Sequence, residues 1–313
     1  MQEQEEARFV SKASSISASI DNELPSTPPL DARWLKHYCA QDEEGQLEAF
    51  VPATPAFSCD DSDAPALVCV PGLGMDATCF LRQLPLGTRA DLHLLRMSGD
   101  AAGDEKGIDL FARYVERYTR HRNLEKRGII LLGSSMGGAV ALAVATRRKV
   151  NLLGLVLAGT FGHHHHLSQK QHLMTRLSWV VPGWLIRLFA TPMLKQTKDF
   201  GDFSEQEAEF MLACMRVPTQ GYLIRATDAI RQLDLLGAAR DLTVPALVLH
   251  GTDDQVLPLE AGRELADAIP NARLVPLQGG GHASFFLDYE SINSSILGFM
   301  QQVIQKPRRA RTA

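Results

Sequence analysis

The sharpest chemical signal in the sequence is a serine placed between glycines. Residues 133–138 have the sequence Gly-Ser-Ser-Met-Gly-Gly, which matches the pattern Gly-x-Ser-x-Gly, with an apolar stretch before it and an Ala-rich stretch after it. A tight turn from a strand into a helix presents the central serine at the carboxyl end of a sheet, beside a helix N-terminus. The pattern predicts Ser135 as a nucleophile, the alternative being a glycine-rich turn without chemistry.

A serine hydroxyl is a weak nucleophile and needs a base to take its proton. Residues 279–282, Gly-Gly-Gly-His, supply an imidazole in a loop near the end of the chain. His282 is the candidate base, because it follows the last apolar run and the glycines beside it leave the backbone free to turn. His250 ends an earlier apolar run, where we expect a buried structural role.

The base in turn needs a carboxylate that holds its tautomer and offsets the imidazolium charge. The segment 250–258 carries two, Asp253 and Asp254, directly after an apolar run. An acid at either position gives the chain order serine, acid, histidine that is typical of enzymes with this serine turn. The spacing leaves the choice between the two open.

The negative charge that develops when a serine attacks a carbonyl needs backbone N–H donors. The amide of Met136, directly after the nucleophile, is the first candidate. The second is expected in the turn of residues 70–76, Val-Pro-Gly-Leu-Gly-Met-Asp, which follows an early apolar run. Leu73 is the first choice there and Gly74 the second, the alternative being a plain glycine turn.

Short apolar runs alternate with amphipathic stretches through most of the chain. Near-continuous apolar strands that alternate with helices predict an α/β fold with a mostly parallel sheet covered on both faces. The predicted strands are 66–70, 92–96, 128–132, 152–157, 246–250 and 272–277. The predicted helices are 108–120, 139–146, 259–269 and 292–304.

One segment, residues 161–236, breaks the alternation. It contains no convincing strand, and residues 204–207, Ser-Glu-Gln-Glu, predict a capping box ahead of a helix that ends near Met215. An apolar stretch between Leu173 and Phe189 either packs onto the core, lines an acyl pocket or contacts a lipid surface. The segment is therefore predicted to be a helical insertion between two strands of the sheet.

Four consecutive histidines, His163 to His166, lie near the start of this insertion. Consecutive side chains of a regular helix cannot all face one ion, and a metal site needs spaced ligands with a carboxylate nearby. The run is interpreted as a solvated loop, with adventitious or functional metal binding as the alternatives.

Composition excludes several classes of protein. The 313 residues are 45% hydrophobic and 22% charged, with a net charge of −4, which argues against a nucleic-acid partner. The five cysteines form no Cys-x-x-Cys pair, so reduced thiols in the cytoplasm are expected rather than a disulfide scaffold or a zinc ribbon. The most apolar stretch, residues 173–194, contains Arg176 and Arg187, and its uncharged part falls far short of the roughly 20 residues of a membrane-spanning helix. Membrane contact is not expected.

With these motifs in this order, the sequence resembles the α/β-hydrolase superfamily, in the branch of lidded serine carboxylesterases, lactonases and carbon–carbon bond hydrolases. The resemblance covers residues 34–304. It implies Ser135 as nucleophile, His282 as base and Asp254 as acid, since the family acid usually stands four residues before a proline, here Pro258. The turn departs from the family, which often has His-Gly where this chain has Pro71-Gly72.

The resemblance also implies a division of the chain. Residues 31–160 and 237–305 form the hydrolase core, 161–236 a helical cap or lid, 1–30 a flexible leader and 306–313 a basic tail. The expected function is cleavage of a small-molecule carboxylic ester or thioester through an acyl-enzyme, with no cofactor and no metal. The alternatives are carbon–carbon bond hydrolysis or acyl transfer by the same three residues, and a non-catalytic small-molecule receptor of the same fold.

Overall fold

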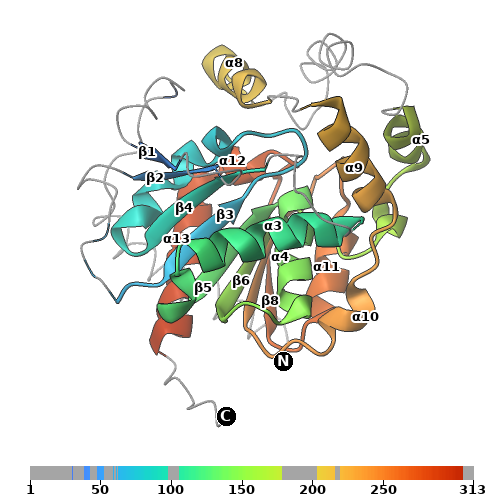
Figure 1. Cartoon of the computed structure of the whole chain (residues 1–313). Helices are drawn as coiled ribbons and strands as arrows, with labels where there is room; N and C mark the ends of the chain where they lie inside the picture. Colours follow the sequence, from blue (N-terminus) through green and yellow to red (C-terminus); the bar gives the residue numbers. More distant parts are fainter. Residues whose placement is uncertain are drawn as a thin grey trace, which may run out of the picture.

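A computed structural model describes residues 63–97, 106–177, 203–215 and 219–305, the strand segments 39–42 and 48–52, and residues 30, 59 and 61. In this part of the chain eight strands form one sheet in the order β1-β2-β4-β3-β5-β6-β7-β8 (Figure 1). The strands are β1 (Cys39–Asp42), β2 (Glu48–Pro52), β3 (Ala66–Val70), β4 (Asp91–Arg96), β5 (Ile129–Ser134), β6 (Leu152–Ala158), β7 (Ala246–Gly251) and β8 (Ala272–Leu277).

Six of these strands, from β4 across to β8, pair in parallel, and they are the six strands that the sequence predicts. The predicted mostly parallel α/β fold is therefore confirmed. The strands β1 and β2 were not predicted, and they add an antiparallel hairpin at the β4 edge. They are short and carry Gln41, Asp42 and Glu48, so they lack the continuous apolar character of strands that are buried on both faces.

Helices cover both faces of the sheet (Figure 1). Alternate strand residues point to opposite faces, so Val68 and Leu131 pack in one apolar cluster and Leu67 and Leu132 in the other. The first cluster includes residues of α3 (Ile108–His121), α4 (Met136–Arg147) and α11 (Leu259–Ala268). The second includes residues of η3 (Ala77–Thr88), α12 (Ser284–Leu287) and α13 (Tyr289–Gln305), and η4 (Leu124–Lys126) connects α3 to β5.

The segment between β6 and β7 is helical wherever it is regular in the described residues. Its elements are η5 (His164–His166), α5 (Gln169–Leu177), α8 (Glu205–Cys214), α9 (Gln220–Arg231) and α10 (Leu236–Ala239). The capping box predicted at Ser204 is present, with Ser204 Oγ accepting from the Glu207 amide and the Glu207 carboxylate accepting from the Ser204 amide. In Figure 1, α5, α8 and α9 lie beyond the upper end of the sheet.

This segment is anchored to the core at two separate places. Tyr222 of α9 packs edge-on against Phe111 of α3, with ring centroids 5.7 Å apart. Phe210 of α8 stacks on Phe286 of α12, with ring centroids 5.6 Å apart. The two helices are therefore fixed to opposite sides of the sheet, because α3 and α12 cover different faces.

Several predictions concern residues outside the described part. These are the leader (residues 1–29), the basic tail (306–313) and most of the apolar stretch, from residue 178 to Phe189. The stretch begins on α5 with Leu173, whose side chain is exposed. Among the described residues, no helix combines the length and the apolar character needed to cross a membrane. In the same part of the chain, Cys59, Cys69, Cys79 and Cys214 form no disulfide bond.

Candidate active site

Ser135 lies at the sharp turn between β5 and α4. Its φ of 53° and ψ of −123° put a non-glycine residue in a region that L-residues rarely occupy. Neighbouring glycines make the turn possible, since a Cβ at Gly137 would come within 2.0 Å of the Val70 carbonyl oxygen. The Ser135 side chain does not cap α4. Its hydroxyl is therefore available to another partner.

That partner is His282, which follows β8 in the loop that leads to α12. Its Nε2 lies 3.1 Å from Ser135 Oγ, and its Nδ1 lies 2.8 Å from Asp254 Oδ2. Since an ionised carboxylate only accepts hydrogen bonds, Nδ1 carries a proton and Nε2 of the neutral ring accepts from the serine hydroxyl. The structure thus brings Ser135, His282 and Asp254, which are far apart in the sequence, into one hydrogen-bonded chain.

Asp254, rather than Asp253, contacts the histidine. The Asp254 side chain is fully buried, and its Oδ1 accepts from the amides of Val256 and Leu257 at 2.9 and 2.8 Å. This leaves Oδ2 to accept from His282. Asp253 is exposed, and its carboxylate accepts from the Thr252 hydroxyl.

The electrostatics of Asp254 favour its ionised form. Burial by itself raises the pKa of this carboxyl, but the hydrogen bond and charge of His282 and the Leu257 amide outweigh burial. The net result is a pKa below the ordinary value of 3.8. Asp254 is therefore ionised near neutral pH and accepts from His282.

His250 is a neighbour of the site whose contact with the acid the sequence did not reveal. It is fully buried at the end of β7, where its Nε2 donates to the Leu257 carbonyl at 2.9 Å and lies 3.5 Å from Asp254 Oδ2. Burial lowers the pKa of His250, with smaller contributions from His282 and His166. A neutral ring that bonds Leu257 helps to fix the loop whose amides hold Asp254.

The turn after β3 passes directly over the serine. A Cβ added at Gly72 would lie 3.3 Å from Ser135 Cβ, and the Met75 amide donates to the Gly72 carbonyl at 3.2 Å to close the turn. Gly74 has the φ of 70° that the third position of a type II turn requires. The predicted donor Leu73 is the second residue of this turn, and Met136 is the first residue of α4.

A contact with Tyr222 of the insertion distinguishes between Leu73 and Gly74, the two candidate oxyanion donors of this turn. The Gly74 amide hydrogen-bonds the Tyr222 hydroxyl, and burial raises the pKa of Tyr222 to about 12. Gly74 therefore already has an acceptor in the protein, which favours Leu73 as the donor to a substrate. No sequence motif marks Tyr222, because its contact depends on how α9 packs.

A second group of side chains, with atoms that can ligate a metal ion, is not part of this triad. Among the described residues, the group able to hold a metal ion is His165, His166 and Glu264, on η5 and α11. In the histidine run, His165 and His166 contact Glu264. His93 is buried on β4 against Tyr118, with 2.7 Å between His93 Nδ1 and the Tyr118 hydroxyl, and His37 lies outside the described residues.

A parallel sheet of this order, with a serine turn between its fifth strand and the following helix, defines the α/β-hydrolase class. The chain belongs to this superfamily, and within it to the family described as serine aminopeptidase, S33, whose model matches residues 99–287, more than half of the chain. It is thus a member of a family of hydrolases.

Individual relatives agree with this assignment. The chain is 26% identical to a putative carbamate hydrolase, RutD, of Pseudomonas savastanoi pv. phaseolicola over 253 residues, covering 77% of this chain and 96% of that protein. It superposes on the enol-lactonase of Burkholderia xenovorans LB400 with a TM-score of 0.68 at 20% identity, covering 84% of this chain and 100% of the other. A thermophilic esterase of Thermogutta terrifontis gives a TM-score of 0.67 at 21% identity, covering 85% and 98%.

Proposed function

We propose that this hydrolase cleaves a small-molecule carboxylic ester or thioester through an acyl-enzyme on Ser135. The observation that carries the proposal is the hydrogen-bonded chain from Ser135 Oγ to His282, at 3.1 Å, and from His282 to Asp254, at 2.8 Å. A serine, a base and a buried acid in this arrangement are the parts that acyl transfer requires.

The first half of the reaction makes the acyl-enzyme. His282 Nε2 takes the hydroxyl proton as Ser135 Oγ attacks the substrate carbonyl carbon. Asp254 stabilises the imidazolium that forms, without itself taking the proton. When the tetrahedral intermediate collapses, His282 gives this proton to the leaving alcohol or thiol, and the acyl group stays on Ser135.

The second half releases the acid. A water molecule gives a proton to His282 Nε2 and attacks the acyl carbon. When the second tetrahedral intermediate collapses, the bond from the acyl carbon to Ser135 Oγ breaks, His282 returns the proton to Ser135 Oγ, and a carboxylic acid leaves. In both halves the amides of Leu73 and Met136 are the proposed oxyanion donors. Each such donor is typically worth about 10²–10³ in kcat.

The substrate is proposed from the chemistry of the site and of the relatives. The relatives are described as a carbamate hydrolase, an enol-lactonase and an esterase, and each of these substrate classes has a carbonyl bonded to a heteroatom. We assign residues 161–236 the role of a cap that shapes the acyl pocket. The reason is that Tyr222 of α9 accepts a hydrogen bond from Gly74, in the turn after β3 that holds the proposed donor Leu73. The reaction as written uses no cofactor.

Turnover and covalent labelling test the proposal together. The purified chain is assayed with p-nitrophenyl esters from acetyl to palmitoyl and with an aminoacyl p-nitroanilide, and it is labelled with a fluorophosphonate that is located by mass spectrometry. We expect ester turnover, a label on Ser135, and a loss of about 10⁴–10⁶-fold in kcat for Ser135→Ala. Ser134→Ala, which removes the adjacent hydroxyl, is the matched control and should keep its activity.

The other outcomes separate the alternatives. Full ester turnover in Ser135→Ala would exclude the mechanism. Turnover of the anilide alone would replace the ester with an amide substrate. A labelled serine without turnover of either kind would mean a competent nucleophile that needs a narrower substrate. Neither label nor turnover would point to a receptor.

A further inference from the structure

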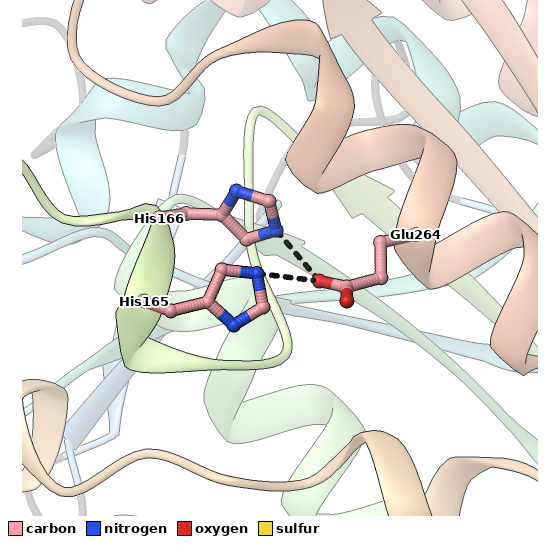
Figure 2. A group of neighbouring side chains, drawn as sticks. All are labelled: His165, His166 and Glu264. Atoms are coloured by element: carbon pink, nitrogen blue, oxygen red, sulfur yellow. Dashed lines mark hydrogen bonds and ion pairs between the residues drawn. The ribbon is translucent and has the colours of Figure 1, made fainter.

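The histidine run forms a compact group with a carboxylate of the core. Residues His164–His166 make the short helix η5, and the side chains of His165 and His166 both turn toward Glu264 of α11 (Figure 2). Their Nε2 atoms lie 3.2 Å and 2.6 Å from the same oxygen, Glu264 Oε2. The solvated loop predicted from the sequence describes His165, whose side chain is 48% exposed, but not His166, at 10%.

The hydrogen bonds fix where the lone pairs of this group point. His163 Nδ1 accepts from the His165 amide at 3.0 Å, so this nitrogen carries no proton. The same nitrogen lies 2.8 Å from His165 Nδ1, which must therefore be the protonated partner. A neutral His165 then directs its Nε2 lone pair at Glu264 Oε2.

Two lone pairs that face each other need a cation between them, either a proton on His165 Nε2 or a metal ion. At this position the two acceptors are an imidazole nitrogen and an ionised oxygen, and the second imidazole, His166, has its Nε2 at the same oxygen. All three potential ligand atoms lie within 4.8 Å of one another. The group therefore offers two nitrogens and one oxygen that converge on one small volume.

We propose that His165, His166 and Glu264 form a binding site for a divalent transition-metal ion of the zinc class. Zinc takes imidazole nitrogen and carboxylate oxygen at about 2.0–2.2 Å in tetrahedral geometry, so neighbouring ligand atoms stand about 3.3 Å apart. The 3.2 Å between His165 Nε2 and Glu264 Oε2 already matches this spacing. The shorter contact of His166 lengthens by several tenths of an ångström when the ion replaces its Nε2 proton.

The site joins two parts of the chain that are far apart in sequence. His165 and His166 stand at the start of the insertion, just after β6, whereas Glu264 stands on α11 of the core. A bound ion would therefore fasten the first turn of the insertion to α11. The partial exposure of His165 and Glu264 provides an entry path and leaves room for water as the fourth ligand.

Zinc binding to the full chain tests the site directly. The protein is stripped with a chelator, titrated with Zn²⁺ alone in a calorimeter, and heated with and without the ion. We expect a tight stoichiometric site, a melting temperature raised by several degrees at saturation, and release of protons on binding. Glu264→Gln, which keeps the shape of the side chain, should weaken the affinity of that site at least about tenfold.

Matched controls separate this site from other histidines and carboxylates. Glu260→Gln removes an exposed carboxylate one turn earlier on α11, and His121→Ala removes an exposed histidine at the end of α3. Both should bind Zn²⁺ within about twofold of the unmodified chain. His166→Ala, checked for folding by circular dichroism, should lose the site as Glu264→Gln does. Absence of stoichiometric binding, or equal affinity in Glu264→Gln, would overturn the proposal and leave a protonated His165 as the cation at this position.

Discussion

Imidazoles meet carboxylates at two places in this molecule, and the two carboxylates are held in opposite ways. Asp254 is fully buried, and two backbone amides occupy its Oδ1. Glu264 is 38% exposed, and its Oε2 is shared by two imidazoles. The first arrangement leaves one oxygen for one histidine and so gives the hydrogen bonds a direction. The second gathers several lone pairs at one point.

The difference shows that residue types alone do not define the chemistry of a site. Two backbone amides occupy Asp254 Oδ1, and the buried Oδ2 accepts from His282, which suits the handling of a single proton. The hydrogen bonds of Glu264 on α11 are not restrained in this way, and the two imidazoles that contact it belong to consecutive residues, His165 and His166. This convergence suits an ion rather than a proton relay.

The largest effect, a loss of kcat, should come from a substitution that breaks the hydrogen bond from His282 to Asp254. Asp254→Asn keeps the shape of the acid but offers an amide to His282, which favours the wrong tautomer of the ring, so kcat should fall about 10⁴-fold. Asp253→Asn is the matched control one residue away and should change kcat by less than about twofold, because that carboxylate faces solvent. Steady-state kinetics with the best ester measures both. Equal losses would show that the geometry does not assign the acid.

A smaller effect should appear in the pH dependence of stability. Because the pKa of Asp254 is lower in the folded chain than in the unfolded chain, its ionised form stabilises the fold above the unfolded pKa, near 3.8. This contribution is lost as the pH falls through the folded pKa. The difference in unfolding free energy between the unmodified chain and Asp254→Asn, measured with urea, should stay constant from pH 7 to about 5 and shrink at lower pH. A difference independent of pH would contradict this linkage.

The smallest effect is expected for a substitution in the group of His165, His166 and Glu264 when no metal is bound. Glu264→Gln removes a partly exposed charge, so the unfolding free energy should change by less than about 1 kcal/mol. Ester turnover by the chelator-treated variant should stay within about twofold, because Glu264 is in the second group and not in the triad. A large loss of kcat without a loss of stability would show that the two sites are coupled, through His166 and His250, more strongly than the contacts imply.

Much of the fold could be predicted because the parallel strands from β3 to β7 are largely buried on both faces. Each of the six parallel strands is an apolar run that stands out in the sequence, as Ile129 to Leu132 does. The hairpin of β1 and β2 could not be found in this way, since its residues are mixed and its position depends on pairing with β4. The long 3₁₀ helix η3 was missed as well, and it contains Pro85 within its span.

The sequence predicted the motif residues of the candidate site but not the neighbouring residues that hold them in place. The motifs placed Ser135, His282 and one of two aspartates, and their catalytic roles stay predictions. Spacing left Asp253 and Asp254 open, and the resemblance to the family favoured Asp254, which two backbone amides hold in the structure. The contacts of His250 and Tyr222 with the site depend on packing between distant elements and could not be predicted. For the histidine run, the sequence did not reveal which carboxylate would lie beside it. The partner is Glu264 on α11, which stands 98 residues after His166 in the chain.

The crowding at Gly137 has a consequence for engineering this protein. The atoms that a Cβ would strike are the carbonyl oxygens of Val70 and Pro71, which belong to the backbone. No compensating change of a neighbouring side chain can remove them, so a library that randomises this position will return glycine whatever substrate is selected.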